Sequence, residues 1–300
     1  MNLVIGIDAG ASKTNAVLVR GDGQEIARAS AGGANLFVSP LALVARNLQA
    51  VLEPLLAHGD VRAVCVGAAG AGRDEQAALL RELLQPLVSP ETALTIVHDG
   101  AIALRAAGQR RPSMVVVAGT GSLAYGERAD RTSVRAGGYG ALVGDDGSAF
   151  AIGRAALHHA MRVFDGIENA SGLSDAIASS SGAATPEDLS RSFREDGIEA
   201  VARVAPVVEA ARASGDAHAR RIVDEQGARL AELALRVARQ IRPRDEALPV
   251  SFTGGAFAAV PPLADVVERA LHAAGLCEVS RAKIDSPLGA AHIAREALPR

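Results

Sequence analysis

The first segment with side chains suited to chemistry is a short turn between two apolar runs. It reads Gly6-Ile7-Asp8-Ala9-Gly10-Ala11-Ser12-Lys13-Thr14. Small residues let backbone N–H groups approach an anion, and Ser12 and Lys13 add donors. Asp8 can hold Mg²⁺ through water, because this ion keeps several waters and takes few carboxylates. The segment indicates either a phosphate-binding turn or an ordinary glycine-rich hairpin. A P-loop does not fit, because a P-loop opens a helix and residues 14–18 have a strand pattern.

Two further glycine-rich turns follow strand-like runs. One reads Gly119-Thr120-Gly121-Ser122 and lies between two apolar segments; the other reads Thr253-Gly254-Gly255-Ala256-Phe257 and opens a helical pattern. Each could be a tight turn with no ligand. Taken with the first turn, the second forms a pair of hairpins that could clamp a polyphosphate. The third has two glycines at a strand–helix junction, which lets a phosphate or a flat ring lie on the backbone.

One carboxylate, Asp99, stands where a strand ends and a helix begins, in the run Val97-His98-Asp99-Gly100. Ligands of α/β proteins gather at the carboxyl ends of strands. A carboxylate there can take the proton of a hydroxyl that attacks a phosphate. The alternative is a helix N-cap. We interpret His98 as a packed or hydrogen-bonded neighbour and not as a second base.

Two other polar residues follow glycine-rich segments. Asn35 comes after Gly32-Gly33-Ala34, and its amide can both donate to and accept from hydroxyl groups, although asparagine is also common in turns. Asp145 and Asp146 flank a turn before a helix, a place where carboxylates often cap or face solvent.

The elements that must position these residues alternate between strands and helices. We expect strands at 3–7, 14–19, 25–31, 62–67, 93–97, 114–118, 122–127, 132–136 and 249–253, and helices at about 40–57, 74–85, 100–107 and 262–274, with a last helix after 285. From about 147 to 243 the chain is rich in Ala, Arg and Glu with helical periodicity. The scheme of buried strand, small-residue turn and returning strand occurs at 5–12 and again at 115–122, which indicates two similar α/β domains.

The order and spacing of the three turns resemble the actin-like ATPase superfamily. The run Gly137-Gly138-Tyr139-Gly140-Ala141-Leu142-Val143-Gly144-Asp145-Asp146-Gly147-Ser148-Ala149-Phe150 is similar to a motif of its N-acetylglucosamine and glucosamine kinase branch. The resemblance implies an α/β fold of two actin-like, ribonuclease H-like domains around a central cleft. They would cover residues 1–110 and 111–300, the second with a helical region at about 150–245. An alternative is that the last helix packs back on the first domain.

The resemblance also implies roles for individual residues. Asp99 matches the catalytic base. The sugar-binding positions are Asn35, Asp99, Ser122, Gly138, Tyr139, Gly140 and Asp145. The ATP-binding positions are Gly10, Ala11, Ser12, Lys13, Thr14, Gly119, Thr120, Gly121, Gly254 and Gly255, with Asp8 holding Mg²⁺ through water. Tyr139 stands where the branch more often has Trp, and Leu123 replaces a polar residue, so these departures leave the exact sugar open.

The expected function is an ATP- and Mg²⁺-dependent kinase acting on the 6-hydroxyl of an amino-hexose, with N-acetylglucosamine as the first choice. Glucosamine, N-acetylmuramic acid and glucose are open alternatives. A related possibility is a 2-hydroxyacyl-CoA dehydratase activator, whose iron–sulfur cluster needs two suitably placed cysteines in each subunit. A third is a sugar sensor without turnover, although no DNA-binding helix-turn-helix precedes Met1. A homodimer is a further expectation from the family, although no heptad seam or apolar stripe indicates it.

Composition excludes several other classes of protein. The chain has 300 residues, 49% of them hydrophobic and 22% charged, with a net charge of −3, so a nucleic-acid partner is not expected. Cys65 and Cys277 are the two cysteines, and their separation argues against a zinc motif or a disulfide framework. We see no signal peptide and no apolar run long enough to span a membrane, and therefore expect a cytoplasmic protein.

Overall fold

The computed structural model describes residues 2–36, 39–69, 71, 74–183, 185–242, 247–275 and 277–298. The chain forms two compact units. Met1–Arg111 and Ala282–Arg300 make up the first unit, and Pro112–Arg281 make up the second. The last segment lies in the first unit, as in the alternative in which the last helix packs back on the first domain.

The first unit contains a five-stranded sheet in the order β3-β2-β1-β4-β5. β1 and β2, and β2 and β3, are antiparallel, whereas β4 and β5 run parallel to β1. The elements are β1 (Leu3–Ala9), β2 (Lys13–Arg20), β3 (Glu25–Gly32), α1 (Leu41–Leu56), β4 (Val61–Ala68), α2 (Asp74–Leu84), a 3-10 turn (Gln85–Leu87), β5 (Ala93–His98), α3 (Asp99–Ala106) and α11 (Ser286–Glu296).

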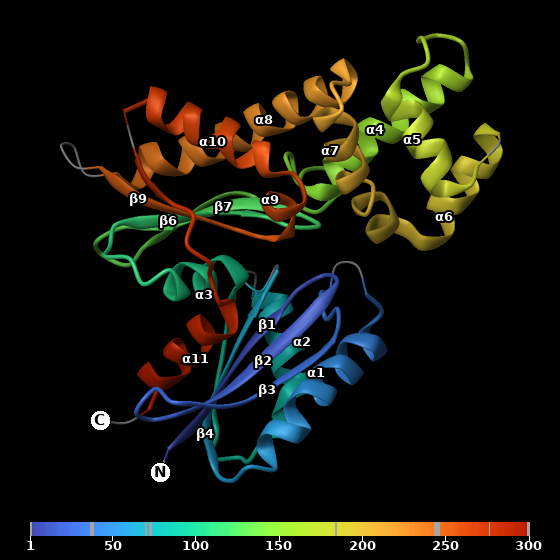
Figure 1. Cartoon of the computed structure of the whole chain (residues 1–300). Coiled ribbons are helices and arrows are strands. Elements are labelled where there is room, and N and C mark those ends of the chain that lie inside the picture. Colours follow the sequence, from blue (N-terminus) through green and yellow to red (C-terminus); the bar gives the residue numbers. More distant parts are fainter. Residues whose placement is uncertain are drawn as a thin grey trace. The chain divides into compact units, whose positions relative to one another are not determined.

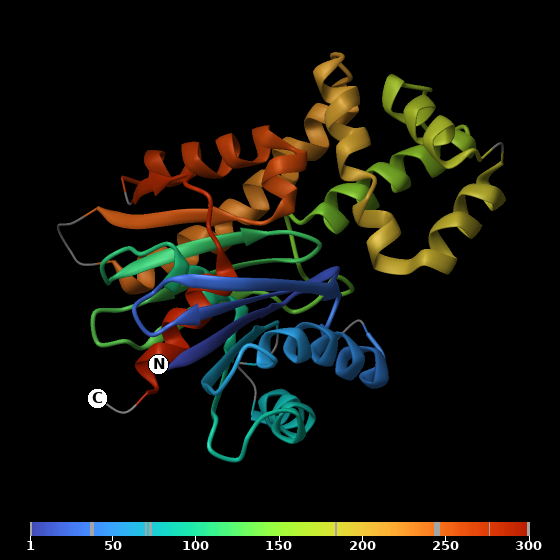
Figure 2. The same ribbon diagram turned by 60° about the horizontal axis from the view of Figure 1, so that its bottom comes forward.

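Both faces of this first sheet are covered by helices. Ile5 and Ile7 of β1 share a core with Leu48 of α1 and Leu80 of α2, and these two helices lie on the same side of the blue strands in Figure 2. Val4 belongs to the opposite core, together with residues of α3 and α11. Because side chains alternate along a strand, Gly6 and Asp8 face the same side as Val4.

A close contact between β1 and α11 explains why the last helix belongs to the first unit. A Cβ atom at Gly6 would lie 2.2 Å from the backbone nitrogen of Ala291, and one at Gly289 would lie 2.0 Å from the carbonyl oxygen of Ile102. Glycine at both positions lets α11 approach β1 and α3 at backbone distance.

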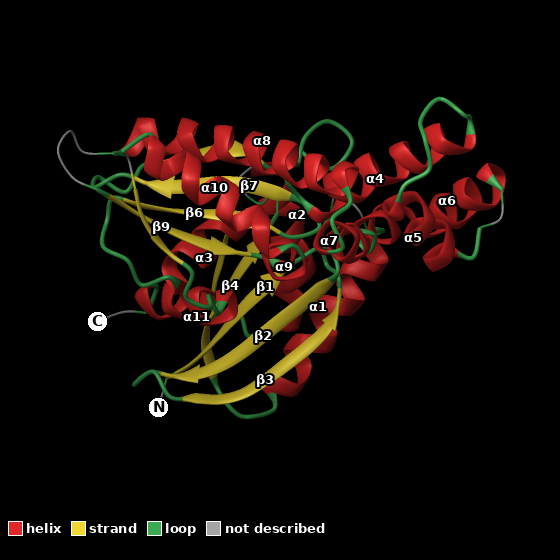
Figure 3. Cartoon of the chain, turned by 45° about the horizontal axis from the view of Figure 1, so that its top comes forward, coloured by secondary structure: helices red, strands yellow, loops and turns green. Residues whose placement is uncertain are grey.

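The second unit repeats the same sheet with a different set of strands. The order β10-β9-β6-β7-β8 mirrors the first sheet, with β7 and β8 antiparallel and β9 and β10 parallel. The elements are β6 (Ser113–Ala118), β7 (Ser122–Glu127), β8 (Ser133–Gly137), α4 (Ala149–Phe164), α5 (Gly172–Ser181), α6 (Pro186–Ala202), α7 (Ala205–Ala213), α8 (Ala217–Ile241), β9 (Leu248–Thr253), α9 (Gly255–Ala259), α10 (Pro261–Ala273) and β10 (Cys277–Ser280). The strands of each sheet stand out in Figure 3.

The repeat expected from the sequence is confirmed by this matching strand order, and so is the α/β class. The helical region is the segment α4–α8, inserted between β8 and β9. The long helix α8 buries Leu230, Ala234 and Val237, and it lies beside α10 in Figure 1. The strand β10 was not expected. No helix among the described residues has the length and apolar character needed to cross a membrane.

Candidate active site

In the first unit, two of the expected site residues lie at the carboxyl edge of the sheet. Asp8 is the last but one residue of β1, and Asp99 follows β5 as the first residue of α3. The strands β1, β4 and β5 are parallel, so their carboxyl ends meet at the same edge. The fold thus places both carboxylates where the sequence analysis expects chemistry.

Asp8 lies in an environment that disfavours its charge. Burial, the negative charge of Asp99 and the negative charge of Asp285 raise the pKa of the Asp8 carboxyl to about 7. Asp285 is the N-cap of α11, and its carboxylate is paired with the guanidinium of Arg28 at 2.7 and 3.2 Å. The positive charge of Arg28 therefore neutralises part of the negative charge that Asp285 adds near Asp8 and Asp99.

This excess of negative charge fits a hard divalent cation. Magnesium ions take oxygen ligands and keep several of their waters. A cation near Asp8 would favour the charged carboxylate, which burial and the neighbouring acids oppose. The residues present therefore suit Mg²⁺, and Asp8 is the side chain that would hold it.

The carboxylate of Asp99 is held by its neighbours. Its Oδ1 atom lies 2.6 Å from Nδ1 of His98 and accepts a hydrogen bond from the backbone N–H of Gly100 at 2.9 Å. His98 is buried, and its Nδ1 also lies 3.1 Å from the backbone nitrogen of Gly100. A ring nitrogen either donates or accepts, and the 2.6 Å approach to a carboxylate oxygen needs a hydrogen on Nδ1, so we assign Nδ1 as a donor to Asp99 and not as the acceptor that caps α3. The side chain of Asp99 is 24% exposed. Asp99 is therefore accessible to a ligand while its orientation is fixed by a buried ring.

The first turn is closed by backbone contacts. Gly10 N–H donates to the carbonyl of Lys13, and the N–H of Ala34 donates to the carbonyl of Gly10. A Cβ atom at Gly33 would lie 1.6 Å from the carbonyl oxygen of Ala11, so only glycine permits this approach. The buried Asn35 thus follows directly on the segment that packs against the turn.

The polar side chains of the first turn differ in exposure. Ser12 and Lys13 are exposed, as a ligand-binding role requires. Thr14 is buried, and its hydroxyl donates to the carbonyl of Gly32 at 2.8 Å. In this conformation Thr14 stabilises the pairing of β2 with β3.

In the second unit, the turn between β6 and β7 lies against the start of α4. The backbone N–H groups of Ala149 and Phe150 donate to the carbonyls of Gly119 and Thr120. A Cβ atom at Gly121 would lie 2.6 Å from Oδ2 of Asp145. The buried carboxylate of Asp145 therefore lies directly against the second glycine-rich turn.

Asp145 has an unusual backbone conformation. Its φ angle is 62°, a left-handed conformation that aspartate tolerates better than most residues. The turn is held from α8, because Gln226 Oε1 accepts from the N–H of Gly147 at 3.0 Å and Arg229 pairs with Asp146 at 3.4 Å. The two adjacent acids thus separate, with Asp145 buried and Asp146 paired on the surface side.

Ser122 links the other expected sugar-binding positions. Its Oγ donates to the carbonyl of Asp146 at 2.6 Å, and its carbonyl accepts from the N–H of Gly138. Tyr139 is 57% exposed, with the guanidinium of Arg135 5.2 Å from its ring centroid. Ser122, Gly138 and Asp145 are therefore brought together, and Gly138 is followed by the exposed Tyr139 and the half-buried Gly140.

The third glycine-rich turn adjoins the end of β6. Gly254 has a φ angle of 113°, and a Cβ atom there would lie 2.2 Å from the carbonyl oxygen of Ala118. Gly255 is the first residue of α9. Because β6 and β9 are parallel neighbours, the turns after both strands lie at the same edge of the second sheet.

The sequence analysis did not single out several residues that support these positions. Asp285 resembles an ordinary helix cap followed by proline, and Arg28, Gln226 and Arg229 lie far along the chain from the residues they hold. Only the Asp285-Ser286-Pro287 capping pattern carried a signal in the sequence, and it predicts a helix start without indicating a charge near Asp8.

Comparisons with known proteins agree with this arrangement. An N-acetylmuramic acid/N-acetylglucosamine kinase from Clostridium acetobutylicum is 29% identical over 303 residues, covering 98% of this chain and 99% of that protein. An N-acetyl-D-glucosamine kinase from Dictyostelium discoideum is 25% identical and covers 97% of each chain.

A solved structure shows the same fold. The Chromobacterium violaceum protein provisionally named N-acetylglucosamine kinase superposes with a TM-score of 0.79, with 24% identity and coverage of 98% of this chain and 99% of that one. Residues 5–294, nearly the whole chain, match one family. The chain belongs to the BadF/BadG/BcrA/BcrD ATPase family.

Proposed function

We propose that this protein is an ATP-dependent kinase that transfers the γ-phosphate to the 6-hydroxyl of an amino-hexose, with N-acetylglucosamine as the principal acceptor. The observation that carries the proposal is the geometry of Asp99, an accessible carboxylate oriented by a buried histidine at the carboxyl edge of the sheet. The names of the two curated relatives, which match nearly the full length, support the same reaction.

Asp99 is the residue to which we assign proton transfer. A sugar hydroxyl is a weak nucleophile at neutral pH, and a carboxylate in hydrogen-bond reach accepts its proton as it attacks phosphorus. His98 holds Oδ1 of Asp99, so we assign Oδ2 to the sugar hydroxyl. His98 acts as a positioning residue and not as a base.

The glycine-rich turns are the segments to which we assign ATP. Backbone and hydroxyl donors around Ser12 and Thr120 would bind phosphate oxygens, and the backbone at Gly254 and Gly255 would accommodate the adenosine. Gly10 and Gly119 have N–H groups engaged within their own turns, so they shape the turns. A bound Mg²⁺ ion supplies positive charge to the phosphate oxygens, and Asp8 would hold it through water.

The sugar is assigned to the polar groups that the resemblance marks for it. The proposed contacts are Asn35, Ser122, Asp145 and the backbone of 138–140. N-acetylmuramic acid is the second acceptor to consider, because the relative from Clostridium acetobutylicum is named for both sugars. We place the reaction in the cytoplasm, where ATP and free amino sugars meet.

A dehydratase activator is disfavoured by the position of Cys65. This residue lies within β4 and is fully buried, and burial raises the pKa of its thiol to about 12. An iron–sulfur cluster needs accessible thiolates. Absorbance of anaerobically purified protein tests this alternative, and an iron–thiolate band would overturn the kinase proposal.

A coupled assay of ADP release tests the proposed reaction directly. N-acetylglucosamine, N-acetylmuramic acid, glucosamine and glucose are compared at equal concentration, and the product is examined by phosphorus NMR. We expect sugar-dependent ADP release that is fastest with an acetylated amino sugar, and phosphate on oxygen 6. Sugar binding measured by calorimetry without sugar-dependent ADP release would instead identify a sensor.

A further inference from the structure

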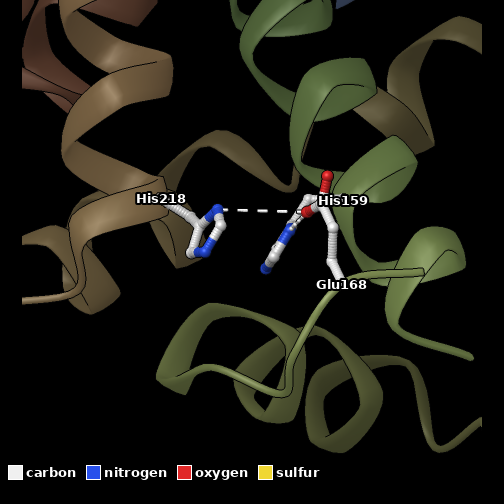
Figure 4. Close-up of side chains that lie close together, drawn as sticks. All are labelled: His159, Glu168 and His218. Atoms are coloured by element: carbon white, nitrogen blue, oxygen red, sulfur yellow. Dashed lines mark hydrogen bonds and ion pairs between the residues drawn. The ribbon is translucent and has the colours of Figure 1, made fainter. Parts of the chain in front are cut away.

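A cluster of histidine and glutamate side chains lies in the helical region of the second unit. It consists of His159 on α4, Glu168 in the loop before α5 and His218 in the first turn of α8, as Figure 4 shows. One potential ligand atom from each residue lies within 4.8 Å of the other two, which singles out this trio among the described residues. Three segments that are distant in sequence thus bring two imidazoles and a carboxylate together.

We propose that His159, Glu168 and His218 bind a divalent transition-metal ion of the zinc class. Two imidazole nitrogens and one carboxylate oxygen are a ligand set that zinc uses, with the fourth position left to water. The proposal does not depend on the kinase assignment, because the cluster lies in the inserted helices and contains none of the residues assigned to ATP or sugar.

The hydrogen bonds behind His159 are those of a metal ligand. Its Nε2 atom lies 2.9 Å from Oγ of Ser171. That oxygen accepts from the backbone N–H of Ser174 at 3.3 Å, and its second lone pair can accept from Nε2–H of His159. Such a bond from the second ring nitrogen is the usual support of a metal-binding histidine, and it directs Nδ1 towards Glu168.

The two carboxylate oxygens of Glu168 have different neighbours. Arg162 Nε donates to Oε1 at 2.7 Å, whereas Oε2 faces both histidines, 2.5 Å from Nδ1 of His159 and 4.0 Å from Nδ1 of His218. Glu168 would therefore bind the ion through Oε2 alone, with Arg162 orienting the carboxylate.

Small movements convert this arrangement into a coordination site. Two ligand atoms of a tetrahedral zinc ion lie about 3.3 Å apart, given bonds of about 2.0–2.1 Å. The ion would replace the proton between His159 and Glu168, and that proton is released to solvent. The rings of His159 and His218 are stacked 4.1 Å apart at 20°, so His218 must turn to aim at the ion. Its side chain is 31% exposed, and turning it gives up the ring stacking and a 3.3 Å contact with Arg221.

The ion would tie together the two helices that hold the Asp145–Gly147 turn. Ser148 caps α4 just after that turn, and Gln226 and Arg229 of α8 bind it. His159 and His218 lie further along the same helices. A metal at this cluster would therefore brace the inserted helices and the motif turn that they support.

Equilibrium dialysis of the full chain against Zn²⁺ tests the proposal. We expect one ion per chain with a Kd in the micromolar range or below, and at least about 10-fold weaker binding for His218→Ala and for Glu168→Gln. The matched control is His272→Ala, because His272 faces Glu268 at 3.3 Å and Arg281 also pairs with Glu268. This surface group resembles the cluster but contains one histidine, so His272→Ala should bind Zn²⁺ as tightly as the wild type.

Two further measurements separate metal binding from folding. Zn²⁺ should raise the Tm of the wild type and of His272→Ala but not of His218→Ala. Cobalt in place of zinc should give the visible absorption of a tetrahedral site, lost in Glu168→Gln. The metal-free Tm of His218→Ala should stay within about 2 °C of wild type, because its ring is partly exposed. Absence of bound Zn²⁺, or unchanged binding in both ligand variants, would overturn the proposal.

Discussion

The Nδ1 atom of His98 lies 2.6 Å from Oδ1 of Asp99, across the junction of β5 and α3. The backbone N–H of Gly100 bonds to the same oxygen. Oδ1 thus has two donors from the protein, and the orientation of the carboxylate is set before any substrate binds. This arrangement leads to different expectations for the two residues.

Asp99→Asn should remove the base and leave the site otherwise intact. General-base catalysis contributes about 10²- to 10⁴-fold, so we expect kcat to fall by about that factor in the ADP-release assay. The Kd for sugar, measured by calorimetry, should change little because the amide keeps its hydrogen-bonding capacity. Turnover close to wild type would remove Asp99 as the base.

His98→Ala should affect catalysis through the orientation of Asp99. Loss of a hydrogen bond to a charged group costs about 1.5–3 kcal/mol, which corresponds to at least about a 10-fold fall in kcat. His98→Asn is the matched control, since its amide N–H can replace Nδ1–H and should restore most of the activity. Equal losses in both variants, with lowered Tm, would indicate a packing role instead.

Much of the fold follows from local patterns in the sequence. The apolar runs at 3–7 and 114–118 are short and rich in Val and Ile, and a glycine-rich turn follows each. They therefore predict buried strands, and the structure contains β1 and β6 there. The repeated scheme predicts two similar sheets, which the strand order confirms. β10 was missed because Cys277–Ser280 is only four residues long, so its alternation of apolar and polar residues is too short to stand out as a strand pattern.

The candidate site was less accessible to sequence reasoning. Glycine-rich turns and the Asp99 junction are contiguous motifs, so they could be identified directly. The charge that Asp285 brings near Asp8 depends on α11 returning to β1 across more than half of the chain. The same holds for the hydrogen bond from Gly147 to Gln226, because no local sequence pattern indicates which distant helix packs on a turn.

Gly121→Ala should displace the carboxylate of Asp145 without removing it. The new Cβ atom would lie 2.6 Å from Oδ2 of Asp145, so the side chain must move away from its buried position. We expect sugar binding to weaken by about 10-fold, or about 1.4 kcal/mol, as measured by calorimetry. In the control Gly172→Ala the nearest atom is at 3.5 Å, and its affinity should match wild type. Unchanged affinity in Gly121→Ala would argue against a sugar contact by Asp145.

Asp8→Asn should stabilise the folded protein and abolish its activity. The pKa of the Asp8 carboxyl is raised from 3.8 to about 7 in the folded state, so the folded state retains a proton that the unfolded chain loses. The raised pKa therefore lowers the free energy of unfolding of the wild type. This loss of stability is absent below pH 3.8, grows as the pH rises, and is complete above about pH 7. Because Asn carries no charge, the variant lacks this loss of stability. The difference in Tm between variant and wild type should therefore grow with pH over the same range.

Thermal unfolding from pH 4 to pH 8.5, without nucleotide and with a chelator present, measures this difference. We expect the Tm of Asp8→Asn to exceed that of wild type by at least about 2 °C above pH 7 and to converge with it towards pH 4. Asp22→Asn is the control, because the side chain of Asp22 is 61% exposed and its loss should give no such pH trend. A Tm difference independent of pH would show that Asp8 carries its charge in the folded protein at no cost. The negative charges of Asp99 and Asp285 would then not disfavour the Asp8 carboxylate, and they would give no reason to place a cation there.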